Sequence, residues 1–253
     1  MRGQPRPRPQ GPSPRPAGQQ QPTEPSSATA APATASPASD RVRLRRKRER
    51  GSYDRAVIEQ ILDEALIAHL GITEPDGQPI VTPTLHARRG SVVYCHGSVA
   101  SRTLRAIAAG APVCLTVSLL DGLVLARSAM HHSANYRSAM LLGRGRSVED
   151  PAEKLAAAEA IVEHVVPGRW REVRPPTEKE LKATSILAVG IDEASAKVRS
   201  GPPLDDEQDY ALATWAGVVP VHTRFGAPEA DPLLRAGIAE PAYVTAYRRP
   251  GRP

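Results

Sequence analysis

The sequence predicts a mainly β protein with peripheral helices (α+β), in the form of a six- or seven-stranded antiparallel split β-barrel. Segments rich in Val, Leu, Ile and Ala recur between residues 66 and 199, and most connections between them are two to four residues long. Connections this short reverse the chain, whereas parallel strands need a longer crossover, usually a helix. The few helical patterns are short, so they are expected at the periphery of the barrel.

The first part of the barrel is predicted to be a helix followed by a three-stranded meander. Asp54 can cap a helix whose apolar residues, from Val57 to Ala65, recur at three- and four-residue spacing. Strands are expected over 66–73, 79–87 and 91–96. Asp76-Gly77 carries the hairpin signal between the first two strands, and Pro83 places the second strand at an edge or a bulge.

The second part combines further strands with short helices. Helices are expected over 101–109, 150–165 and 177–183 and near 206–213. Strands are expected over 112–120, 123–129, 136–143, 184–191 and 194–199, the last two as a hairpin. Asp121-Gly122 is predicted to be the turn between the first two of these strands.

Composition divides the chain into three parts. Residues 1–50 are predicted to be a disordered Pro/Ala-rich tail with a basic arm, because residues 1–40 contain 10 of the 26 prolines and residues 41–50 contain seven basic side chains. Residues 51–200 form the predicted barrel domain, and residues 201–253 a loop-rich C-terminal extension packing on the barrel. The first 50 residues carry 11 basic and 3 acidic side chains, which leaves 22 and 24 for the remainder.

This charge distribution limits the partners that we expect. The near-neutral remainder and its few aromatic residues argue against a nucleic-acid-binding core, so nucleic acid or an acidic surface is expected to make only weak contact with the basic arm. Arg45-Arg46 resembles the start of a twin-arginine export signal, but the apolar run that such a signal needs does not follow. No segment reaches the ~18 apolar residues of a membrane span. We therefore expect a cytoplasmic protein. Whether translation starts downstream and omits part of the tail stays open.

Several common catalytic motifs are absent from the sequence. It contains no GxxxxGK[ST] phosphate loop, no GxGxxG dinucleotide motif, no GxSxG nucleophile motif and no HExxH zinc motif. The two cysteines, Cys95 and Cys114, cannot form a disulfide framework or a four-thiolate zinc site, and buried apolar positions are expected for both. No metal site is therefore predicted.

An ordered set of short segments is more informative than any single motif. The set comprises Tyr94-Cys95-His96-Gly97, Ser101-Arg102-Thr103-Leu104-Arg105, Ala111-Pro112-Val113-Cys114, residues 121–128, residues 131–138 with Gly143, and Trp215-Ala216-Gly217-Val218-Val219-Pro220. Over about residues 53–225 it resembles the pyridoxamine 5′-phosphate oxidase-like superfamily of FMN-binding split barrels. The more similar branch contains the nitroimidazole-resistance-type flavin-nucleotide-binding proteins.

The segment Ser101–Arg105 is suited to binding a phosphate group. Hydroxyl groups at Ser101 and Thr103 can donate hydrogen bonds, and Arg102 and Arg105 add guanidinium groups. In the family that the chain resembles, a Ser-Arg-Lys segment at this place holds the FMN phosphate, and Thr103 stands where the lysine would be. The alternative is an ordinary serine cap followed by two solvated arginines.

The resemblance also implies where the flavin ring would lie. It places the ring against the strand that carries Val81, Thr82 and Pro83, and it implies that Arg137 and Ser138, in place of an Arg-Gln pair, reach the cofactor. His96 ends a strand five residues before Ser101, so either a place near the flavin or a packed histidine bonded to backbone is expected.

The function implied by the resemblance is that of an FMN-dependent oxidoreductase. A nicotinamide cofactor would reduce the flavin, which would pass electrons to a small-molecule acceptor. The family also implies a homodimer with the flavin at the interface. The C-terminal substrate-binding stretch of true pyridoxamine-phosphate oxidases is not recognisable here. The alternatives are a non-enzymatic flavin-binding module and a haem-binding split barrel, the latter supported only by the seven histidines.

Overall fold

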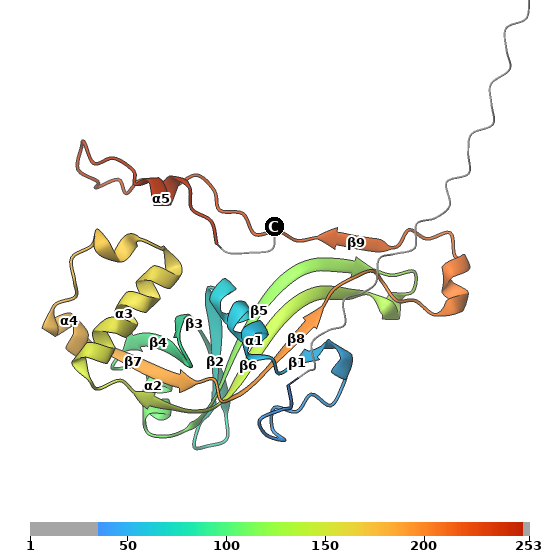
Figure 1. Ribbon diagram of the computed structural model, residues 1–253, viewed down its shortest axis with the longest axis horizontal. Helices are drawn as coiled ribbons and strands as arrows, with labels where there is room; N and C mark the ends of the chain where they lie inside the picture. The colour runs from blue at the N-terminus through green and yellow to red at the C-terminus, as the bar shows by residue number, and fades with distance from the viewer. Residues whose placement is uncertain (1–34, 250–253) are drawn as a thin grey trace, which may run out of the picture. The chain divides into compact units, whose positions relative to one another are not determined.

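The computed structural model describes residues 35–249 and contains one antiparallel sheet that closes on itself (Figure 1). Six strands form the closed ring, which confirms the predicted split barrel. In ring order they are β2 (Ile67–Thr73), β3 (Pro79–Arg89), β4 (Val92–Ser98), β7 (Thr184–Gly190), β6 (Ser133–Ser147) and β5 (Pro112–Leu125). Three further strands extend the sheet: β8 (Glu193–Arg199) beside β6, β1 (Gly51–Ser52) beside β8, and β9 (Gly217–Pro220) beside β5.

The helices begin where their capping residues predict. Asp54 accepts a hydrogen bond from the Ala56 N–H at the start of α1 (Arg55–Glu64), and Asp150 accepts one from the Glu153 N–H at the start of α3 (Pro151–Val165). The other α-helices are α2 (Arg102–Ala108), α4 (Glu178–Ala183) and α5 (Ala242–Thr245). Short 3-10 helices cover Arg48–Arg50 (η1), Ala129–His131 (η2), Arg169–Arg171 (η3) and Glu207–Ala211 (η4).

Two predicted chain reversals are wrong. Asp121-Gly122 is not a turn: β5 runs through it with a β-bulge between Leu120 and Gly122, and β5 pairs with β6 on both sides of the bulge. Residues 184–199 do not form a hairpin, because β7 and β8 both pair with β6 and not with each other. The short connection at residues 191–192 therefore bends the chain along β6 instead of reversing it.

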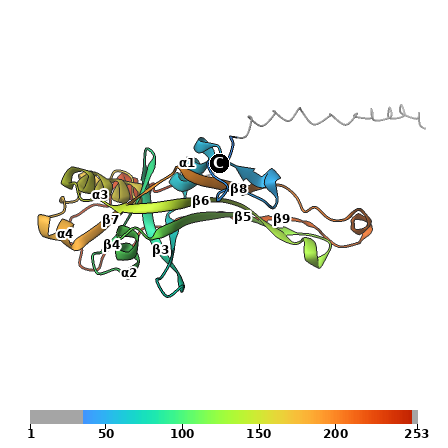
Figure 2. The ribbon, with the colours of Figure 1, turned by 90° about the horizontal axis from the view of Figure 1, so that it is seen from below.

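Two apolar clusters lie on opposite faces of the β4–β7 pair. The cluster inside the barrel includes Cys95, Leu187 and the α2 residues Leu104 and Ile107. The second cluster lies between α3 and the other face of these strands and includes Tyr94, Ile161, Ile186 and Ala188. Figure 2 shows α2 and α3 on the two sides of β4 and β7.

The folded part of the chain begins before residue 51. Val42 is 1% exposed, and the Leu44 N–H donates a hydrogen bond to the Tyr53 hydroxyl at 2.7 Å. The predicted boundary at residue 51 follows the charge pattern, whereas the structure packs one apolar side chain from the middle of the basic arm. The Pro-rich stretch 1–34 lies outside the described residues.

The C-terminal extension contacts the rest of the domain at several points. β9 pairs with the end of β5, and the Tyr247 hydroxyl donates a hydrogen bond to the Val165 carbonyl. Arg249 donates to the carbonyl groups of Asp63 and Glu64 at the end of α1. None of the helices among residues 35–249 combines the length and the apolar composition needed to cross a lipid bilayer.

Candidate functional site

The barrel is split between β3 and β4. β3 pairs with β2 over residues 79–85 but with β4 only over residues 86–89, so the edge of its first half that faces away from β2 carries no strand. The start of α2 lies at this opening, where the Thr82 and Thr103 hydroxyl oxygens are 3.3 Å apart. The split therefore brings together two predicted site residues that are 21 positions apart in the sequence.

Two glycines allow α2 to approach the sheet closely. A Cβ atom on Gly97 of β4 would lie 2.8 Å from Leu104 Cδ1, and one on Gly145 of β6 would lie 2.5 Å from Ile107 Cγ2. Both distances are too short for carbon–carbon contact, so a larger residue at either position would force the Leu104 or Ile107 side chain to move. The close packing holds Thr103 beside Thr82.

The segment Ser101–Arg105 is the predicted phosphate anchor, and its two arginines differ in their surroundings. Arg102 Nε lies 3.2 Å from Glu74 Oε1, although the Arg102 side chain is 67% exposed. Arg105 is exposed and makes none of the ion pairs found among residues 35–249. Ser101 caps α2 by accepting the Leu104 N–H at 3.4 Å. The anchor thus offers hydroxyl groups and two guanidinium groups, one of which is paired with a carboxylate.

The strand beside the anchor presents an open surface. Val81 is 63% exposed, and Thr82 and Pro83 are also exposed. An apolar side chain this exposed is suited to contact with a flat ligand or a protein partner. Of the three predicted ring-contacting residues, only Thr82 shares a face with Thr103, because side chains alternate along β3 and those of Val81 and Pro83 point to the other face.

His96 lies on a different face from the anchor. It pairs with Ile186 of β7, and both side chains face the α3 side of the sheet, whereas α2 packs on the barrel side. Burial lowers the pKa of His96, which favours the neutral ring. Sequence proximity to Ser101 therefore does not bring His96 into the anchor.

Arg137 is buried in an ion-pair network away from the anchor. Its Nη2 lies 2.7 Å from both Glu64 Oε1 and Asp121 Oδ1, and its Nε donates to Asp121 Oδ2 at 2.9 Å. The hydrogen bonds that Arg137 donates to Asp121 and Glu64 raise the Arg137 pKa above its ordinary value. Ser138 follows on the opposite face of β6. Arg144, seven residues after Arg137 on β6, donates a hydrogen bond to the Gly110 carbonyl just after α2. Seven strand residues span roughly 23 Å, so Arg137 lies well away from this end of α2.

Arg137 instead lines a cleft of about 610 Å³ that the sequence analysis does not predict. Two histidines from distant segments, His69 of β2 and His222 after β9, line the same cleft. Its other lining residues include Ile67, Leu119, Arg224, Phe225, Tyr247 and Arg248. The only sequence signal for this site was the presence of histidines, because the cleft depends on how the C-terminal extension crosses the sheet.

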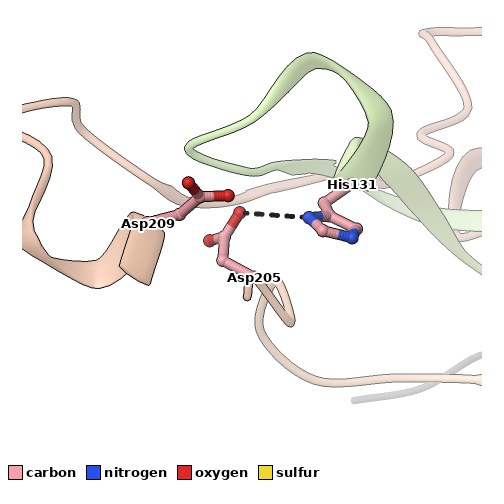
Figure 3. Close-up of side chains that lie close together, drawn as sticks. All are labelled: His131, Asp205 and Asp209. Atoms are coloured by element: carbon pink, nitrogen blue, oxygen red, sulfur yellow. Dashed lines mark ion pairs between the residues drawn. The ribbon is translucent and has the colours of Figure 1, made fainter. Parts of the chain in front are cut away.

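A third group of polar side chains could in principle hold a metal ion. Ligand atoms of His131, Asp205 and Asp209 lie within 4.8 Å of one another (Figure 3). Asp205, however, already accepts hydrogen bonds from the Arg127 N–H at 2.9 Å and the Arg127 guanidinium at 3.1 Å. These bonds join the segment after β5 to the C-terminal extension, which gives Asp205 a structural role without a metal ion.

The split barrel has the flavin-binding fold of the pyridoxamine phosphate oxidase type. A sequence model of the pyridoxamine 5′-phosphate oxidase family matches residues 54–198, and the chain belongs to this family. No functionally curated protein matches the chain.

Several solved structures are similar to this one. The flavocytochrome Anf3 from Azotobacter vinelandii is 43% identical, with a TM-score of 0.81 over 85% of this chain and 100% of that one. An FAD and heme binding protein from Mycobacterium smegmatis is 38% identical, with a TM-score of 0.75 over 79% and 98%. A putative 5-nitroimidazole antibiotic resistance protein from Bacteroides thetaiotaomicron is 25% identical, with a TM-score of 0.50 over 58% and 86%.

Proposed function

We propose that the protein is an FMN-binding oxidoreductase that passes electrons from a nicotinamide reductant to a small-molecule acceptor. The observation that carries this proposal is the juxtaposition of Thr82, Thr103 and Arg102 at the split of the barrel. Membership of a flavin-binding fold family supports it. Bound flavin supplies the hydride and electron transfer.

The residues at the split have distinct tasks in this proposal. The guanidinium groups of Arg102 and Arg105 neutralise the phosphate, and the hydroxyl groups of Ser101 and Thr103 donate hydrogen bonds to its oxygens. The exposed surface of Val81, with Thr82 and Pro83, receives the flat ring. Arg102 has to exchange part of its contact with Glu74 for the phosphate.

The proposed working unit is a cytoplasmic homodimer. A partner subunit would cover the exposed Val81 and complete a ring pocket that one chain leaves open. Light scattering on the flavin-loaded protein tests this part. A mass near 27.0 kDa at micromolar concentration, with flavin still bound, contradicts a shared site.

The absorption spectrum of the purified protein tests the flavin proposal directly. We expect flavin bands, and chromatography of the released cofactor distinguishes FMN from FAD. Arg102→Ala should remove a charge-assisted contact worth roughly 1.5–3 kcal/mol, or one to two orders of magnitude in FMN affinity. Arg89→Ala, an exposed arginine at the far end of β3, is the control. Equal losses in the two variants would place the anchor elsewhere.

A second candidate function is that of a flavin protein that also binds haem. The observation that favours it is the cleft of about 610 Å³ with His69 and His222 in its lining. A neutral imidazole can ligate haem iron, Phe225 offers an apolar wall, and Arg224 and Arg248 can pair with propionates. The two structures at 43% and 38% identity, described as a flavocytochrome and as an FAD and heme binding protein, support this candidate.

Haem addition separates the two functions. If haem binds in the cleft, the protein acquires a Soret band that His69→Ala or His222→Ala shifts or removes, whereas neither variant changes the flavin content. A flavin spectrum with no Soret band after haem addition leaves the first function alone.

A further inference from the structure

We propose that a second cavity, on the α3 side of β4, binds a small fused-ring aromatic molecule that carries a hydroxyl or carbonyl group. The cavity has a volume of about 410 Å³ and lies between α3, η3, α4 and the strands β4 and β7. It does not overlap the split or the histidine-containing cleft, so the inference stands independently of the flavin and haem proposals.

The walls of this cavity are mostly apolar and include one large aromatic ring. Ile161 and Val162 come from α3, Leu181 from α4 and Ile186 from β7, while Trp170 of η3 closes one side. Ligand sites of a few hundred Å³ with apolar walls and few polar groups are typical for small organic molecules. The indole ring favours a flat aromatic ligand, which can stack on it.

The structure holds this cavity open with hydrogen bonds that need no ligand. Glu163 accepts the backbone N–H groups of Gly168 at 2.6 Å and Trp170 at 2.7 Å, which fixes η3 and its indole ring. At the other side, Arg174 donates to Glu180 at 2.8 Å, and Glu180 also accepts the Thr177 N–H at 2.7 Å. Because both sides are fixed, the site is preorganised for a rigid ligand.

The polar contribution to the lining selects the class of ligand. His96 lies in the wall with its side chain exposed at the mouth of the cavity, and its ring makes none of the side-chain hydrogen bonds found among residues 35–249. A neutral imidazole offers one N–H donor and one acceptor, so it can bind either a carbonyl or a hydroxyl group. The charges of Arg174 and Glu180 pair with each other, which disfavours a strongly charged ligand.

The two tryptophans of the chain allow a direct binding assay. Trp170 lines the cavity, whereas Trp215 is 68% exposed on the C-terminal extension. We would titrate the purified full-length protein with 7-hydroxycoumarin, which has two fused rings, a carbonyl and a hydroxyl, and follow tryptophan fluorescence. Saturable quenching is expected for the wild-type protein and for Trp215→Phe, and it should be lost in Trp170→Phe.

Two further variants test the polar and the steric parts of the proposal. His96→Leu should weaken binding of 7-hydroxycoumarin roughly tenfold, the effect of one lost hydrogen bond, but should leave naphthalene binding unchanged. Val162→Phe should fill the cavity and abolish binding of both probes in equilibrium dialysis. Melting curves establish that each variant is folded.

Three results would overturn this assignment. Quenching that persists in Trp170→Phe places the probe elsewhere, and equal binding losses for both probes in His96→Leu remove the role of the hydrogen bond. A change of the protein's mass in light scattering on Val162→Phe, with no bound probe in the wild type, means that the cavity is a contact between protein chains.

Discussion

Acidification should destabilise the protein through one buried histidine. His86 is fully buried in β3; its Nε2 lies 3.0 Å from the Leu62 carbonyl, and its Nδ1 has no hydrogen-bond partner among the described residues. The His164 ring lies 5.0 Å away, and Arg249 contacts His164. Burial first, and then repulsion by His164, lower the pKa of His86 from 6.5 to about 4.

The sign and size of the effect follow from this pKa. Between pH 6.5 and 4 the unfolded chain binds a proton at this position and the folded chain does not, so protonation favours unfolding. The stability present above pH 6.5 is therefore lost as the pH falls towards 4. Each pKa unit corresponds to about 1.4 kcal/mol, so the full loss is about 3 kcal/mol.

Urea denaturation at several pH values between 7.5 and 4.5 measures this loss. The variant His86→Phe cannot titrate, so its free energy of unfolding should fall less over the same range, by about 2–3 kcal/mol. If that variant does not fold, His164→Phe should raise the pKa of His86 and reduce the loss of unfolding free energy at acid pH. Parallel pH profiles for the wild-type protein and both variants would refute the reasoning.

Three other changes have outcomes that the structure predicts. A protein starting at residue 51 should melt roughly 5 °C below one starting at residue 35, because it loses the buried Val42; equal melting temperatures would contradict the packing of the basic arm. Glu74→Gln should tighten flavin binding roughly two- to fivefold, because Arg102 is freed for the phosphate; weaker binding in a flavin titration would show that Glu74 supports the site. Arg137→Met should cost roughly 3–5 kcal/mol in urea denaturation by leaving Glu64 and Asp121 unpaired, and a loss below 1 kcal/mol would mean that solvent already screens them.

Local signals in the sequence were sufficient where a few neighbouring residues decide the structure. Asp54 and Asp150 accept the helix N–H groups that their positions predict, and Thr177 with Glu180 forms a capping box. Asp121-Gly122 shows the limit of this approach. Its turn signal is overridden because β6 pairs on both sides of the bulge and Arg137 binds the Asp121 carboxylate.

The candidate site could be predicted only in part for a related reason. The Ser101–Arg105 segment is local, so its hydroxyl and guanidinium groups could be identified from residue types alone. Which face of a strand a side chain occupies depends on register and on the covering helices. Strand periodicity puts the side chains of His96 and Cys95 on opposite faces of β4. It does not reveal that α3, rather than α2, covers the face that carries His96.

Arg137 illustrates why residue type alone does not establish a role in cofactor binding. A guanidinium group has five N–H donors, and here Nε, Nη1 and Nη2 bond to Asp121 and Glu64, with Nη2 bonding to both. One donor remains, and the pair of carboxylates offsets the positive charge that would attract a phosphate. Arg102 and Arg105, by contrast, are exposed beside Thr103 at the split. Substituting Arg137 should therefore change the stability of the fold before it changes flavin affinity, whereas substituting Arg102 should do the reverse.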